Sequence, residues 1–111
     1  MSILGKLFGL GGPESDAVKV LPVKDFIEGM KNKKAQLVDV RTPNEFRQGH
    51  YKNAENIDFF DRINFDKKLE KLDKNRPVYL YCRSGMRSNK AAKKLAQMGF
   101  QEIYDLSGGY R

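Results

Sequence analysis

The chain has 111 residues, 40% of them hydrophobic, which is enough for one domain with an apolar core. Its single cysteine excludes an internal disulfide and a Cys-rich zinc site, so we expect a fold independent of oxidation and a reducing, cytoplasmic location. The net charge of +7 gathers in the second half and indicates an anionic partner, although solvated helix faces would give the same pattern.

The first thirty residues predict an arm, a strand and a helix. Residues 1–16, with Gly11, Gly12 and Pro13 near their end, predict an N-terminal arm or short helix ahead of a domain at 17–111. The short β-prone run 17–21 predicts an edge strand. Pro22 then opens a helix, whose apolar residues fall on one face: Val23, Phe26, Ile27 and Met30.

A second strand and helix follow. The apolar run 36–40 has the length of a strand. Thr42 and Glu45 have the spacing of a capping box, and Pro43 suits the first helical position. Gly49 is placed to end this short helix.

The second half repeats the alternation. We expect a short strand within 54–59, strands at 78–82 and 102–106, and a helix from Ser88 to Gly99. Another helix is predicted between the first two of these strands by the spacing of Phe65, Leu69 and Leu72. Strands that alternate with helices predict an α/β fold, with a mainly parallel central sheet flanked by helices.

The most informative segment is the turn after residues 78–82, which holds the lone Cys82. Active sites of parallel α/β sheets form at the carboxyl ends of strands, where Cys82 lies. Backbone N–H groups, the start of the next helix and two arginines favour a thiolate there, and a thiolate is a nucleophile. The candidate catalytic residue is Cys82, and the candidate anion-binding loop consists of Arg83, Ser84, Gly85, Met86, Arg87 and Ser88.

For both the cysteine and the arginines, a purely structural role stays open at this point. A lone cysteine is most often a small buried hydrophobic residue. The arginines of the loop could be structural partners of acidic residues, which we expect of Arg83 more than of Arg87.

Four segments together resemble the single-domain rhodaneses, a family of sulfurtransferases. They are LVDVRTPNEFRQGHYKNAENI, VYLYCRSGMRS, AAKKLAQMGF and YDLSGGY, and they cover about residues 18–110. The resemblance implies a three-layer rhodanese-like fold. It also implies a thiosulfate:acceptor sulfurtransferase that needs no cofactor or metal and forms a persulfide on Cys82.

In the family's reaction, Cys82 takes sulfur from a small anionic donor such as thiosulfate, steered by Arg83 and Arg87. An acceptor, which is cyanide or a thiol and can be a protein thiol, then removes the sulfur. The alternative is a persulfide carrier or docking module with little thiosulfate turnover of its own. Cysteine phosphatases have a similar layout, but five residues separate their cysteine from the arginine. Only four residues separate Cys82 from Arg87, which disfavours a phosphatase.

Four further polar residues fit structural roles near the site. The resemblance makes Asp39 and Arg41 structural, with Arg41 pairing with Glu45 or Asp39. His50 is the only histidine, so a hydrogen-bonded structural role is favoured over a metal site or a general base. We find no nucleic-acid-binding motif and no apolar stretch long enough to cross a membrane.

Overall fold

The structure is a computed structural model that describes residues 16–110. Almost all of the expected N-terminal arm, residues 1–16, lies outside this range. The described chain contains one sheet in the order β1-β5-β4-β2-β3, in which every neighbouring pair is parallel. The strands are β1 (Val18–Leu21), β2 (Gln36–Asp39), β3 (Glu55–Asn56), β4 (Val78–Tyr81) and β5 (Ile103–Leu106).

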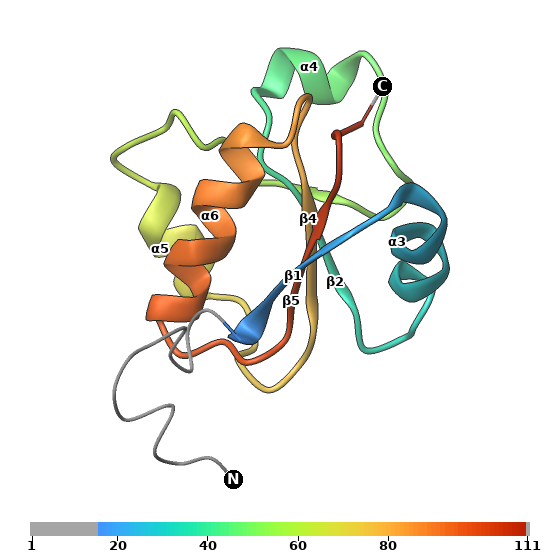
Figure 1. Cartoon of the computed structure of the whole chain (residues 1–111). Coiled ribbons are helices and arrows are strands. Elements are labelled where there is room, and N and C mark those ends of the chain that lie inside the picture. Colours follow the sequence, from blue (N-terminus) through green and yellow to red (C-terminus); the bar gives the residue numbers. More distant parts are fainter. Residues whose placement is uncertain (1–15, 111) are drawn as a thin grey trace, which may run out of the picture.

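Helices cover both faces of the sheet and give three layers (Figure 1). They are α3 (Val23–Met30), α4 (Pro43–Arg47), α5 (Phe65–Glu70) and α6 (Met86–Gln97). In Figure 1, α5 and α6 lie on one side of the strands and α3 on the other. The expected three-layer α/β fold with a parallel sheet is therefore confirmed, and β1 is an edge strand as predicted.

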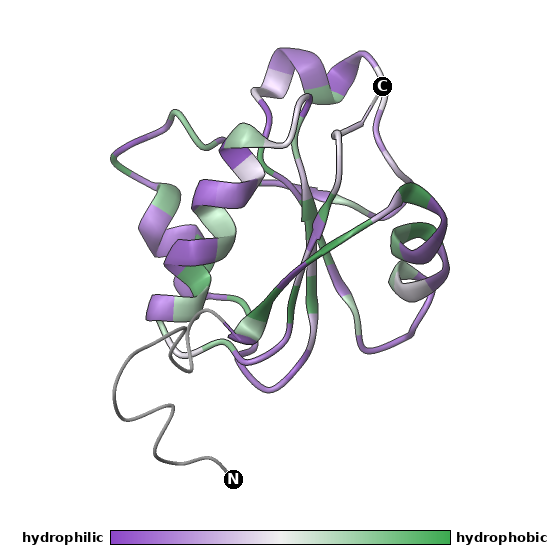
Figure 2. Cartoon of the chain, viewed as in Figure 1, coloured by the Kyte–Doolittle hydropathy of each residue, from purple (hydrophilic) through white to green (hydrophobic). Residues whose placement is uncertain are grey.

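Two apolar clusters form the core, one on each face of the sheet. The larger joins the strands to α5 and α6 and includes Leu69, Leu80 and Leu95. The smaller contains Phe26 of α3 against Tyr79 and Tyr81, whose side chains alternate with Leu80 along β4. Figure 2 shows these hydrophobic stretches of the strands running through the middle of the molecule. Because β4 is buried on both faces, the strand is apolar throughout.

Local signals place α4 and misplace the start of α6. The capping box of Thr42 and Glu45 forms as predicted, with Pro43 as the first helical residue. Helix α6 begins at Met86 rather than at the predicted Ser88. Gly85 is the residue before the helix, with φ of 101°, so the loop turns earlier than its polar composition suggested.

All five strands run in the same direction, so their carboxyl ends lie together at one end of the sheet. Cys82 follows β4, the middle strand of the five, at this end. No helix among the described residues is long and apolar enough to cross a membrane.

Candidate functional site

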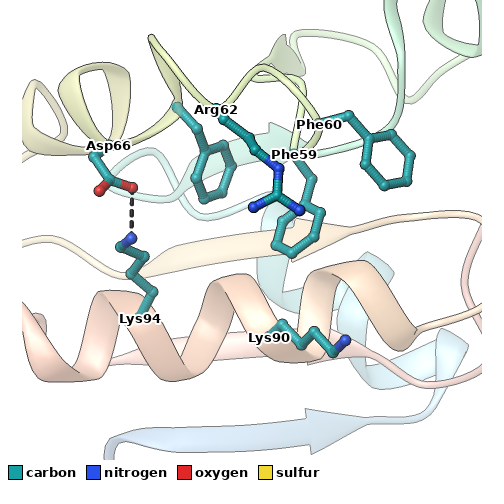
Figure 3. A pocket seen from close by; sticks show the side chains of 7 residues that line it. Phe59, Phe60, Arg62, Asp66, Lys90 and Lys94 are labelled. Carbon is teal, nitrogen blue, oxygen red and sulfur yellow. Dashed lines mark ion pairs between the residues drawn. The ribbon is translucent and has the colours of Figure 1, made fainter.

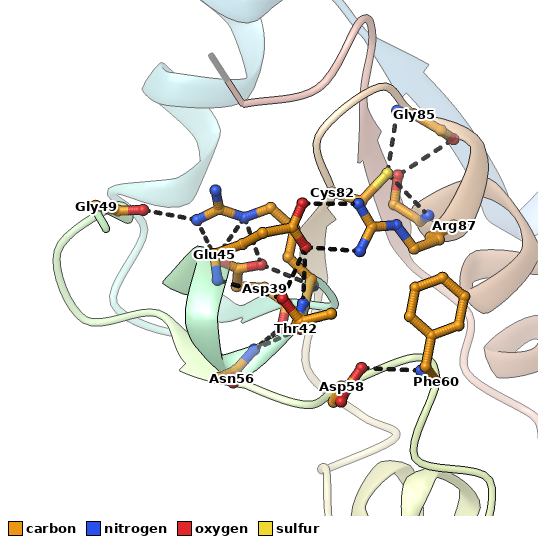
Figure 4. Close-up of polar contacts among 12 residues, drawn as sticks. Asp39, Thr42, Glu45, Gly49, Asn56, Asp58, Phe60, Cys82, Gly85 and Arg87 are labelled. Atoms are coloured by element: carbon orange, nitrogen blue, oxygen red, sulfur yellow. Dashed lines mark hydrogen bonds and ion pairs between the residues drawn. The ribbon is translucent and has the colours of Figure 1, made fainter. Parts of the chain in front are cut away.

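The sulfur of Cys82 is surrounded by its own loop. The residue has no exposed surface. Its Sγ accepts hydrogen bonds from the backbone N–H groups of Gly85, at 3.0 Å, and Ser88, at 3.3 Å (Figure 4). Two inward N–H donors stabilise negative charge on this sulfur, or on one bound to it.

The segment after β5 fixes the outer side of the loop. The N–H of Tyr110 donates to the carbonyl of Cys82 at 2.7 Å. Gly109 packs so closely on Arg83 that an added Cβ would lie 2.2 Å from the Arg83 carbonyl oxygen. A glycine is therefore required at position 109 for the last segment to lie against the loop.

The buried carboxyl group of Asp105 is hydrogen-bonded to the Cys82 loop. Ser88 Oγ donates to Asp105 Oδ1 at 2.5 Å, and Asn89 Nδ2 approaches the other oxygen at 3.5 Å. Asp105 is only 2% exposed, and burial raises the pKa of its carboxyl group despite these hydrogen bonds. Asp105 thus fixes the residue whose N–H points at the sulfur. The sequence showed only its position in the last strand.

A second carboxylate engages the loop arginine. Arg87 Nη1 and Nη2 donate to the two oxygens of Glu45, at 2.8 and 3.1 Å. The same carboxylate accepts the N–H of Thr42 within the capping box. The hydrogen bond from Arg87 is the main cause that lowers the pKa of Glu45 to about 2. The helix cap at α4 and the Cys82 loop are therefore one hydrogen-bonded unit.

The expected roles of the two loop arginines are exchanged. Arg87, not Arg83, is the one held by an acidic residue. Arg83 is exposed, and its side chain makes no ion pair or hydrogen bond within residues 16–110. Together with Ser84, Arg87 and Tyr110 it lines a depression of about 300 Å³ at the mouth of the loop. Among the described residues, Arg83 thus contributes to this depression a positive charge that no acidic side chain compensates.

Met86 and Gly85 are two further members of the predicted anion-binding loop. Met86 is 69% exposed and is the first residue of α6. Gly85 adopts the positive φ described above, which a side chain would strain.

Asp39 and Arg41 form a buried ion pair beside the site. Arg41 Nη2 donates to Asp39 Oδ2 at 2.6 Å and to the carbonyl of Gly49 at 2.7 Å. Burial is the largest single influence and lowers the pKa of Arg41, but the hydrogen bond with Asp39 and the nearby negative charges, that of Asp39 first, together outweigh it and the pKa of Arg41 is raised. The guanidinium also lies 4.6 Å from the ring centre of Tyr110. Of the two acidic partners expected for Arg41, the structure shows Asp39 and not Glu45, while the structural role of this ion pair stays a prediction.

His50 lies at the exposed end of α4. Its Nδ1 is 2.7 Å from the carbonyl of Phe46, and its ring stacks on the Phe46 ring at 3.6 Å. The expected hydrogen bond of His50 is thus present, and its structural role stays a prediction.

Comparison with known proteins gives a consistent result. The model of the "Rhodanese-like domain" family matches residues 22–111. The chain is 40% identical over 94 residues to "Uncharacterized protein YqhL" of Bacillus subtilis, covering 85% of this chain and 71% of that protein. It is 36% identical over 81 residues to "Thiosulfate sulfurtransferase GlpE" of Vibrio cholerae, covering 73% and 74%.

A solved structure shares the fold. The rhodanese-related protein of Thermoplasma volcanium superposes with a TM-score of 0.71 at 28% identity, over 82% of this chain and 85% of that one.

Proposed function

The chain belongs to the rhodanese-like domain family, and we propose that it is a sulfurtransferase that carries a sulfane sulfur on Cys82 as a persulfide. The observation that carries the proposal is that the N–H groups of Gly85 and Ser88 both point at Cys82 Sγ, in a turn with four residues between Cys82 and Arg87. A relative of similar length is named a thiosulfate sulfurtransferase, which supports thiosulfate as the donor. The lone reactive thiol suits a reducing compartment, so we propose that the protein works in the cytoplasm.

The first half-reaction would load the cysteine. The Cys82 thiolate attacks the outer, sulfane sulfur of thiosulfate, and a new S–S bond forms. The S–S bond of thiosulfate breaks, and sulfite leaves with the electron pair. Arg83 attracts the dianion to the depression, and the N–H groups of Gly85 and Ser88 stabilise the charged sulfur.

The second half-reaction would unload it. Cyanide or a thiolate attacks the outer sulfur of the persulfide, the Cys82 S–S bond breaks, and thiocyanate or a new persulfide leaves. The Cys82 thiolate is thereby restored. The chain holds no second cysteine that could form a disulfide with Cys82, so the acceptor is another molecule.

Intact-mass spectrometry tests the proposal directly. The protein is incubated with thiosulfate, desalted and weighed before and after the addition of cyanide. We expect a gain of one sulfur atom that cyanide removes and that the Cys82→Ala variant does not show. An unchanged mass of the folded wild-type protein would sink the proposal.

The carrier form of this function has one specific point in its favour. Met86, a member of the Cys82 loop, exposes 69% of an apolar side chain, which a small inorganic donor does not need. In that form, sulfur would arrive from a partner protein. Loading by a persulfidated cysteine desulfurase would then be much faster than loading by thiosulfate, and the reverse order would exclude the carrier form.

A further inference from the structure

A second concave site lies beside the Cys82 loop, between α6 and the segment that leads into α5. Three phenylalanines line it together with four charged side chains, in a volume of about 300 Å³ (Figure 3). We call it the α6 groove. Its residues are Phe59, Phe60, Arg62, Phe65, Asp66, Lys90 and Lys94.

The α6 groove carries two uncompensated positive charges. Lys94 is held by Asp66 at 2.7 Å, and that pair is neutral. Arg62 and Lys90 are exposed and form no ion pair with any acidic residue of 16–110. The α6 groove thus combines three apolar rings with two cations that have no ion-pair partner within residues 16–110, which suits an anionic group attached to an apolar one.

The α6 groove continues from the mouth of the Cys82 loop. Arg87, Lys90 and Lys94 follow one another at helical spacing, so they lie on one face of α6. The Arg87 guanidinium is 5.2 Å from the ring centre of Phe60, and Phe60 also lines the groove. A molecule whose sulfur reaches Cys82 past Arg87 can therefore extend along α6 over Lys90.

The surroundings of the α6 groove favour a protein as the occupant. Large apolar side chains are exposed on the two segments that border it: Phe60 by 58%, Ile63 by 79% and Met86 by 69%. Thiosulfate and cyanide are too small to contact such a surface. Apolar anchors within a cationic field match a partner with acidic and apolar residues.

We propose that the α6 groove docks an acidic segment of a partner protein whose cysteine exchanges sulfur with Cys82. This rests on the proposed function and names the partner's chemistry. The partner's thiolate attacks the outer sulfur of the Cys82 persulfide, the Cys82 S–S bond breaks, and the sulfur leaves as the partner's persulfide. Transfer in the opposite direction follows the same contacts.

Two synthetic peptides test the docking. Each has one cysteine and one phenylalanine, and they differ only in that four flanking positions are all Glu or all Lys. Cys82 is loaded with thiosulfate, the donor is removed, and transfer of sulfur to each peptide is followed by mass. We expect transfer to the acidic peptide to be about tenfold faster at low salt, with the preference shrinking as salt screens the charges.

Matched charge reversals locate the effect. The double variant Arg62→Glu/Lys90→Glu should lose the preference and keep its loading by thiosulfate. The control is Lys33→Glu/Lys34→Glu, which changes the net charge equally. Both control residues are exposed and precede β2, which is parallel to β4, so they lie at the end of the sheet opposite to Cys82. The control should keep the preference.

Three outcomes would overturn the proposal. They are equal transfer to both peptides, an equal loss in the control variant, and groove-dependent binding of a single-stranded oligonucleotide without any peptide preference. A fluorescent acidic peptide with Ser in place of Cys separates the two proposals, because its binding needs no sulfur chemistry. If thiosulfate fails to load Cys82 but this peptide still binds through Arg62 and Lys90, only the proposed function fails.

Discussion

Glu45 binds the guanidinium of Arg87 through both carboxylate oxygens, although the two residues are 42 positions apart. The contact ties the first turn of α4 to the first turn of α6 across the mouth of the Cys82 loop. Because this carboxylate compensates the charge of Arg87, Arg83 is the cation of the depression at the loop that has no acidic partner within residues 16–110.

The two arginines should therefore fail in different ways when removed. We expect Arg83→Ala to raise the KM for thiosulfate about tenfold with little change in kcat, since it loses one charge-assisted contact with the donor. Arg87→Ala should lower kcat and also stability, because it leaves the Glu45 carboxylate without its partner. Steady-state kinetics and urea unfolding of both variants provide the measurement. Similar kinetic losses in both, with unchanged stability, would contradict this division of roles.

The pH dependence of stability should report the contact between Glu45 and Arg87. The pKa of Glu45 is about 2 in the fold against an ordinary 4.5, so its ionised form stabilises the protein above pH 4.5. This stability is lost as the pH falls from 4.5 towards 2. Glu45→Gln should be less stable by about 1.5–3 kcal/mol at pH 7, the range for hydrogen bonds to charged groups, and should converge with the wild type near pH 2. If the free energies of unfolding of the two proteins, measured in urea, differ by the same amount at every pH, the ionisation of Glu45 does not contribute to stability.

The contribution of Asp105 to stability should change with pH in the opposite direction to that of Glu45. Burial raises the pKa of this carboxyl group above its ordinary 3.8, so the fold holds its proton where the unfolded chain has released it. Stability then falls as the pH rises from 3.8 through the raised pKa. In Asp105→Asn, the amide oxygen still accepts from Ser88 and no charge is buried. This variant should gain stability relative to the wild type between pH 4 and 7, measured by urea unfolding. A constant difference would mean that Asp105 does not titrate in this range.

Short-range signals predicted most of the fold and the place of Cys82 at the carboxyl end of β4. The capping box at Thr42 and the apolar runs that became β2 and β4 are readable because they depend on neighbouring residues. The partner of Arg87 is not readable, since it depends on how α4 sits beside α6. The role of Asp105 is hidden for the same reason, because Ser88 lies 17 positions away and on another element.

The two glycines after β5 offer an internally controlled test of how the loop is held. Gly108 and Gly109 have nearly equal φ angles, 75° and 77°, so replacement by alanine costs each about 1–2 kcal/mol of backbone strain. Within residues 16–110, the new Cβ at Gly109 would lie 2.2 Å from the Arg83 carbonyl oxygen, whereas a Cβ at Gly108 meets no atom within 4 Å. Gly109→Ala must therefore displace either the Cys82 loop or the segment of Tyr110. We expect it to lose more stability than Gly108→Ala and to slow the reaction of Cys82 with thiosulfate at least tenfold at a temperature where both variants are folded. Urea unfolding and the rate of sulfur uptake by mass provide the two readings. Equal losses in the two variants would show that backbone strain alone matters and that Gly109 does not position the loop.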